Sequence, residues 1–186
     1  MRTLPCIGYR IWRADSNDLT LASLSDDTPW PIQAKMEANS PPSRGKSGLG
    51  GYGFHAMYEF FHGDSNQVRY EHSHELWYQM ERIARRIEKR PGIHWVAGVI
   101  VAWGEIALHD FGFRAEHCRI VALHYQPSRP DFVHARAVND FNPWLPPTRL
   151  RMIADRYELP IADSPARLAS YAGEWGRHVG PEMLAA

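Results

Sequence analysis

Charged and imidazole side chains flank a turn in the second half of the chain. The pair His109-Asp110 precedes the turn and the pair Glu116-His117 follows it, with Arg114 between them. On an extended segment Arg114 and Glu116 point to the same face, where an ion pair between them would pin the turn. The functional alternative is a site in which the Arg114 guanidinium holds an anionic ligand and the carboxylate and imidazole transfer protons.

Two further residues extend this acid–base hypothesis. Glu105 directly follows an apolar segment, so its carboxylate either is partly desolvated, which suits a general base, or has reached the solvent. His55 lies in a predicted strand, on the face opposite to that of Phe54 and Ala56. A hydrogen-bonded structural histidine is more typical of this position than a catalytic one. The catalytic candidates are Glu105, His109, Arg114, Glu116 and His55, and the candidate ligand contacts are Arg114 and Trp103.

Two other segments suggest ligand chemistry more weakly. His72 and His74 could hold zinc, but side chains two apart diverge on a helix, so a polar helix start is favoured. The Gly-Lys-Ser at 45–47 lies in a Gly- and Pro-rich stretch, 39–53, and has Ser40 where a phosphate-binding loop has its first glycine. We therefore expect a surface loop there, and no metal or other cofactor.

Composition restricts the function class. The chain has 186 residues, 44% of them hydrophobic, with 21 Lys+Arg balanced by 21 Asp+Glu. The hydrophobic content predicts a folded protein rather than a disordered one. The basic helix end from Arg82 to Arg90 could contact phosphates, but zero net charge makes nucleic-acid binding the less favoured alternative.

The two cysteines and the apolar runs bear on the compartment. Cys6 and Cys118 are far apart in sequence, so neither a disulfide framework nor a four-cysteine zinc site is expected. The N-terminus lacks an apolar signal core, and the apolar run at 95–104 is about half the length of a membrane-spanning helix. These features predict a cytoplasmic protein without a membrane partner.

Hydrophobic periodicity predicts the elements that position these residues. Segments 6–12 and 19–24 read as a hairpin, 54–60 as a third strand and 73–90 as a helix. Segment 95–104 is apolar on both faces, which predicts an interior strand, and Gly98 and Gly104 mark sites of a bulge or close approach. Segment 119–125 returns as another strand.

The C-terminal part reads as two helices. Apolar residues recur at helical spacing from Leu150 to Tyr157, and a second helix begins at Ser164-Pro165, with Leu168, Tyr171 and Trp175 on its buried face. The predicted fold is α+β: a twisted, largely antiparallel sheet or half-barrel of about five strands, with one inserted helix and a C-terminal helical pair. Residues 1–147 would form the sheet domain and 148–186 the helical pair, packed together as one compact unit.

Three ordered motifs also resemble a known group of sequences. They are GYRIW at 8–12, GFHA at 53–56, and GVIVAWGEI at 98–106 followed by GFRAE at 112–116. Together they resemble an uncharacterised family of small proteins common in actinobacteria and their phages, over most of the chain. Residues 51–53 are Gly-Tyr-Gly where that family often has Cys-x-Cys, so a metal role for those cysteines does not carry over. The resemblance implies a source but no established activity.

The aromatic scaffold, without a recognisable nucleophile motif, favours a non-enzymatic accessory binding module that engages a protein or a small ligand. Exposed tryptophans among Trp12, Trp30, Trp144 and Trp175 would be its contact anchors. The alternatives are a small enzyme with the acid–base cleft described above and a nucleic-acid binder.

Overall fold

A computed structural model describes residues 6–23, 28–32, 36–37, 54–57, 93–109, 112–125 and 144–178. The strands are β1 (Cys6–Asp15), β2 (Thr20–Ala22), β3 (Met36–Glu37), β4 (Phe54–Met57), β5 (Ile93–His109), β6 (Gly112–His124) and β7 (Ile161–Ala162). The helices are α2 (Pro147–Tyr157) and α3 (Pro165–His178).

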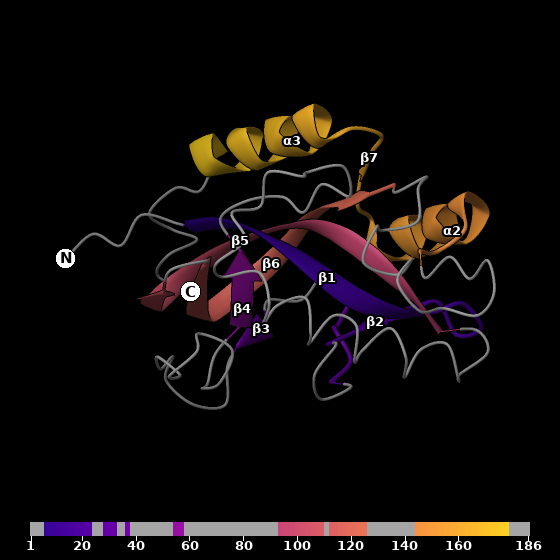
Figure 1. Ribbon diagram of the computed structural model, residues 1–186, viewed down its shortest axis with the longest axis horizontal. Helices are drawn as coiled ribbons and strands as arrows, with labels where there is room; N and C mark the ends of the chain where they lie inside the picture. The colour runs from indigo at the N-terminus through magenta and orange to yellow at the C-terminus, as the bar shows by residue number, and fades with distance from the viewer. Residues whose placement is uncertain are drawn as a thin grey trace, which may run out of the picture.

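The long strand β5 lies inside the sheet, as its apolar pattern predicts. It pairs antiparallel with β1 on one side, where Gly8 lies opposite Ile100, and with β6 on the other, where Val101 lies opposite Arg119. The shorter strand β4 pairs with β6 over four residues and meets β1 at one residue pair. The sheet is therefore strongly curled (Figure 1).

The α+β prediction is confirmed. Among the described strands, every pairing is antiparallel except that of β6 with β7, which is parallel. The described part of the sheet has seven strands, and two of these, β3 and β7, have only two residues each. The remaining five correspond to the expected number, and α2 and α3 form the C-terminal helical pair.

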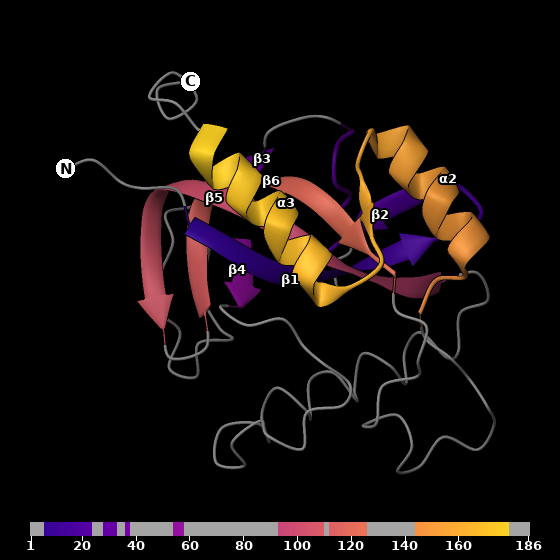
Figure 2. The ribbon, with the colours of Figure 1, turned by 90° about the horizontal axis from the view of Figure 1, so that it is seen from above.

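Apolar side chains pack against both faces of β5. Val99, Val101 and Trp103 share one buried cluster with Leu168 and Ala172 of α3. Figure 2 shows α3 lying across the long strands. On the other face, the alternate β5 residues share a second cluster with α2; they are Val96, Ile100 and Ala102. Burial on both faces explains why this strand carries no polar alternation.

Local sequence signals account for the two helices. The buried residues of α2 are the predicted apolar set: Leu150, Ile153, Ala154 and Tyr157. At the start of α3, the backbone N–H of Arg167 donates to the Ser164 Oγ at 3.3 Å, and Leu168 is fully buried. Ser164 is therefore the predicted cap, followed by a proline at the first helical position.

Several sequence predictions lie outside the described residues. These are the loop at 39–53, the helix at 73–90, the possible zinc ligands His72 and His74, and the basic segment from Arg82 to Arg90. Cys6 and Cys118 are both free thiols, as expected. Cys6 in β1 and Cys118 in β6 pair with Ala102 from opposite sides of β5, so that strand separates them. No helix in the described ranges has the length and apolarity to cross a membrane.

Candidate functional site

A bulge interrupts the pairing of β5 with β6. Trp103 lies opposite His117 and Ile106 lies opposite Ala115, so two residues of β5 face one of β6. Gly104 sits in the bulge with φ +82°, a left-handed conformation that favours glycine. A Cβ at this position would lie 2.6 Å from the Glu116 Oε2, so the missing side chain also makes room for that carboxylate.

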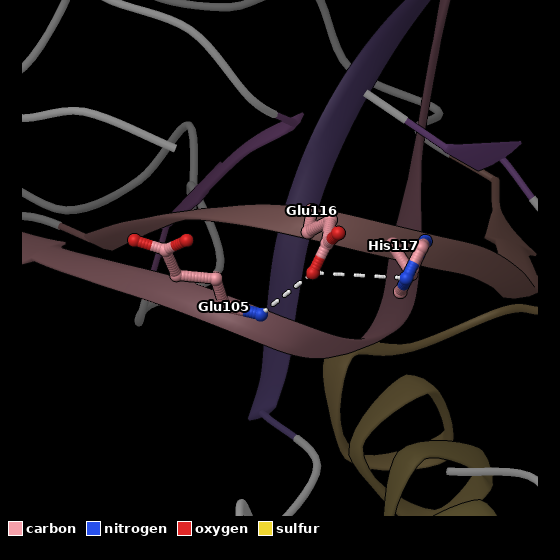
Figure 3. Close-up of polar contacts among 3 residues, drawn as sticks. All are labelled: Glu105, Glu116 and His117. Carbon is pink, nitrogen blue, oxygen red and sulfur yellow. Dashed lines mark hydrogen bonds and ion pairs between the residues drawn. The ribbon is translucent and has the colours of Figure 1, made fainter. Parts of the chain in front are cut away.

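The bulge fixes the carboxylate of Glu116 between two partners (Figure 3). Its Oε2 accepts a hydrogen bond from the backbone N–H of Glu105 at 3.0 Å and lies 3.7 Å from the His117 Nε2. The side chain of His117 is 15% exposed and that of Glu116 is 38% exposed. The His117 Nδ1 is buried without a hydrogen-bond partner in the described structure. This pair therefore fastens the bulge, and the buried Nδ1 of His117 is not accessible to a substrate.

Of the two alternatives for the Glu105 side chain, the structure shows the second, a carboxylate that has reached the solvent. The residue is exposed, because it stands in the bulge and not at the end of a covered strand. Figure 3 shows its carboxylate pointing away from that of Glu116. Glu105 therefore contributes its backbone N–H, and not its side chain, to the cluster.

Arg114 occupies a different place from Glu116. Its position lies opposite Ala107 in β5 and His55 in β4, on the far side of the bulge. The side chain is only 6% exposed, and this burial lowers the pKa of the Arg114 guanidinium from its ordinary value. The side chains of His55 and His109 lie outside the described part. The register thus brings His55 and Arg114 together and leaves Glu105 apart.

The proposed ligand contacts Arg114 and Trp103 are both buried, and they stay a prediction. Trp103 is 5% exposed, and its ring centroid lies 5.9 Å from that of His117. The sequence places His117 beside Glu116 at the turn, although His117 is not among the catalytic candidates. Its neighbour Glu116 was the available signal, but the bulge that brings the two against Gly104 cannot be derived from strand periodicity.

A second site is a cavity of about 150 Å³ at the outer edge of β6. We call it the edge pocket. Its described lining residues come from three segments far apart in sequence: Trp30, Pro31, Arg119, Ile120, Tyr157, Glu158 and Leu159. Its two β6 residues, Arg119 and Ile120, lie between Cys118, which pairs with β3, and Leu123, which pairs with β7. The cavity therefore lies where the edge passes from one short strand to the next.

Hydrogen bonds and ring contacts hold the aromatic wall of the edge pocket. The Tyr157 hydroxyl donates to the Trp30 carbonyl oxygen at 2.9 Å and accepts from the backbone N–H of Leu21 at 2.9 Å. The Trp30 ring packs edge-on against Trp12, with ring centroids 5.4 Å apart, and the Arg10 guanidinium lies 5.2 Å from the Trp30 centroid. The wall is thus fixed before any ligand arrives.

Opposite charges border the same cavity. Arg119 comes from β6, and Glu158 follows the last turn of α2 in a left-handed conformation, φ 52° and ψ 43°. The backbone N–H of Glu158 donates to the Asp155 carbonyl oxygen at 3.2 Å, which sets the position of the residue. Of this set the sequence indicates only Trp30 as a contact residue, because nothing in the local pattern shows that these segments meet.

The structure removes three of the four tryptophans expected as exposed contact anchors. Trp12 is fully buried, Trp30 is 4% exposed and Trp144 is 7% exposed, while the side chain of Trp175 lies outside the described part. Trp144 packs on Trp95 with ring centroids 5.6 Å apart. The rings are large enough to fill the core of a curled sheet, so they serve packing there. Trp30 remains a candidate contact residue because it lines the edge pocket.

Comparison with known proteins adds no assignment: no family model, no curated protein and no solved structure matches this chain.

Proposed function

We propose that this protein is a non-enzymatic binding module that holds a small ligand in the edge pocket. The supporting observation is the cavity itself, which combines an aromatic wall at Trp30, a cation at Arg119 and a hydroxyl-bearing side chain at Tyr157. Ligand sites typically combine apolar lining with a few placed polar groups. At about 150 Å³ the cavity matches one small molecule or one side chain, comparable to an engineered cavity that takes up benzene.

The enzyme alternative has less support among the described residues. Glu116 and His117 are close together, but Glu105 points away and Arg114 lies beyond the bulge. A proton-transfer site needs its groups within hydrogen-bond reach of one substrate position. The binding role is therefore the better match to the arrangement of the side chains.

Thermal unfolding in the presence of small carboxylates, amines, amino acids and sugars tests the proposal. A ligand at a concentration of about 100 times its Kd stabilises the folded state by about 2.7 kcal/mol, which raises the Tm by about 5–10 °C for a chain of this size. The variant Leu159→Phe fills the pocket and should abolish the shift. Met152→Phe, on the exposed surface of α2, is the matched control and should keep it.

Two outcomes would contradict the proposal. The first is that no compound in the screen changes the Tm. The second is a Tm shift that survives Leu159→Phe, because the ligand then binds elsewhere.

The sequence resemblance supports the rest of the assignment: an accessory protein of an actinobacterium or its phage. Nucleic-acid binding through the segment from Arg82 to Arg90 stays a prediction, to be checked by whether any affinity for single strands falls steeply with added salt.

A further inference from the structure

Building on the proposed function, we infer that the ligand of the edge pocket is a small, neutral, planar molecule of the amide class. It carries an N–H donor next to an acceptor oxygen, and it exchanges two hydrogen bonds with the main chain of Ile120. Its flat ring lies against Trp30 and Leu159.

The first argument is a gap in the pairing along the outer edge of β6. Residues 117–118 pair with β3 and residues 123–124 pair with β7, but no strand in the described ranges pairs with residues 119–122 on that side. Two residues of this gap, Arg119 and Ile120, line the cavity. Consecutive side chains point to opposite faces of a sheet, so a cavity lined by both adjoins the edge of the strand and its main chain.

The second argument is the direction of the Ile120 main chain, which the register fixes. The Trp95 carbonyl oxygen accepts from the Leu145 N–H, on the side of β5 away from β1. Main-chain groups alternate in direction along a strand, so those of Val101, six residues on, point to the same side, toward β6. Val101 lies opposite Arg119, so the main chain of Arg119 points into the sheet and that of the next residue points outward. The N–H and the carbonyl of Ile120 therefore both face the gap.

The third argument is that these two groups are buried. Ile120 is only 7% exposed. No hydrogen bond to its outward N–H or carbonyl comes from the part of the chain that the structure describes. Buried main-chain polar groups nearly always have a partner, because losing water without a replacement is costly. A ligand that offers one acceptor and one donor supplies what this edge lacks.

The lining and the size of the cavity define the rest of the ligand. Trp30, Pro31 and Leu159 are apolar, and a volume of about 150 Å³ matches a ring of about the size of benzene. The N–H and the carbonyl of one extended residue lie on the same side, so a donor and an acceptor on neighbouring ligand atoms can bond both. An amide does this without a charge, so no ion has to be desolvated beside the apolar lining.

An NMR titration with three ring compounds tests the inference. 2-Pyridone carries its N–H beside a carbonyl, N-methyl-2-pyridone lacks the donor and pyrrole lacks the acceptor. We expect 2-pyridone to bind at least about 10-fold more tightly than either analogue, because each analogue leaves one main-chain group unsatisfied. In protein labelled with ¹⁵N-isoleucine, 2-pyridone should also move the amide proton of Ile120 downfield. Ile120→Val removes that resonance from the spectrum and so assigns it.

Two variants serve as a matched pair. Leu159→Phe fills the pocket and should abolish binding of 2-pyridone. Glu158→Gln removes a charge from the lining and should leave the Kd of 2-pyridone within about 2-fold, because the ligand is neutral. A loss of 10-fold or more in Glu158→Gln would show that the site recognises a charge, which would overturn the inference.

The remaining outcomes separate the inference from the proposed function. If N-methyl-2-pyridone or pyrrole binds as tightly as 2-pyridone, or if the Ile120 amide does not move, the amide class is wrong, while a small-ligand site stands as long as Leu159→Phe abolishes binding. If 2-pyridone fails to bind and an extended peptide shifts the Ile120 amide instead, the edge takes a strand and the inference is overturned. If none of the three binds but another compound gives a Tm shift abolished by Leu159→Phe, the inference is again overturned and the binding module remains. If no compound of either experiment binds, both are wrong.

Discussion

At Gly104 the missing side chain does two things at once. It allows the left-handed backbone of the bulge, and it admits the Glu116 carboxylate and the His117 ring, which would lie 2.6 Å and 2.8 Å from a Cβ. The sequence marks Gly104 as a site of a bulge or close approach, and that prediction is confirmed. The sequence does not reveal the partner, because the identity of the residue across the sheet depends on register.

We predict that Gly104→Ala lowers the free energy of unfolding by about 1–3 kcal/mol, through backbone strain and the clash with Glu116. Urea unfolding of the two forms measures the difference. Gly173→Ala is the matched control: it lies in α3 with nothing within 4 Å of its Cβ position, and should raise stability by about 0.5–1 kcal/mol. Equal effects of the two substitutions would contradict the bulge argument.

The half-buried His94 makes stability depend on pH. Burial lowers the pKa of His94 below its ordinary value of 6.5, and this outweighs the opposing attraction of Asp15. The unfolded chain then binds more protons than the folded one as the pH falls below 6.5, so this contribution to stability is present above that value and is lost on acidification. We expect His94→Gln to weaken the loss of stability between pH 7 and pH 5, measured by urea unfolding at each pH. An unchanged pH dependence would show that His94 does not contribute.

At the scale of the elements, Tyr157 ties α2 to the N-terminal hairpin. Its hydroxyl bonds the Leu21 N–H and the Trp30 carbonyl, two groups more than a hundred residues away in the sequence. The helical spacing predicts that Tyr157 is buried. It cannot predict these bonds, because they depend on where β2 and Trp30 lie in space.

We predict that Tyr157→Phe lowers the free energy of unfolding by about 1–3 kcal/mol, because it leaves the buried Leu21 N–H without its acceptor. The same change should weaken any ligand of the edge pocket, since the Trp30 wall loses its support. Tyr171→Phe on α3 is the control for removing a tyrosine hydroxyl, and chemical denaturation measures both. A loss no larger than that of the control would mean that the tie is dispensable.

The elements that periodicity predicts well are the long ones. The interior strand, the hairpin and the two C-terminal helices repeat their apolar residues often enough to reveal a face. The strands β3 and β7 have two residues each, too few to show a period, and they form because the chain passes the edge of β6. The β6 residues of the edge pocket lie between the pairings with those two strands, which is why the pocket could not be predicted from the sequence.

At the scale of the whole molecule, the sheet and the C-terminal helices share two buried clusters, one on each face. Sequence reasoning expects 148–186 to pack on the sheet domain as one compact unit. Fully buried Leu168 of α3 is the residue that tests this, because it contacts the sheet and not only its own helix.

We predict that Leu168→Ala lowers the free energy of unfolding by about 2–5 kcal/mol, as for other buried leucines. The chain should still unfold in one transition. Circular dichroism and tryptophan fluorescence, followed in the same denaturant series, should give coincident curves. Ser170→Ala, exposed on α3, is the control and should change stability little. A separate early transition for the helices would contradict the single unit.

The position of α3 after the sheet strands also affects synthesis. As the nascent chain leaves the ribosome, β1, β5 and β6 are available long before residues 165–178, which cover Val99, Val101 and Trp103. Until then that sheet face is exposed to water, and translational pausing before Pro165 would prolong the interval in which it can attract other apolar surfaces. Chaperone demand during translation should therefore peak just before α3 emerges.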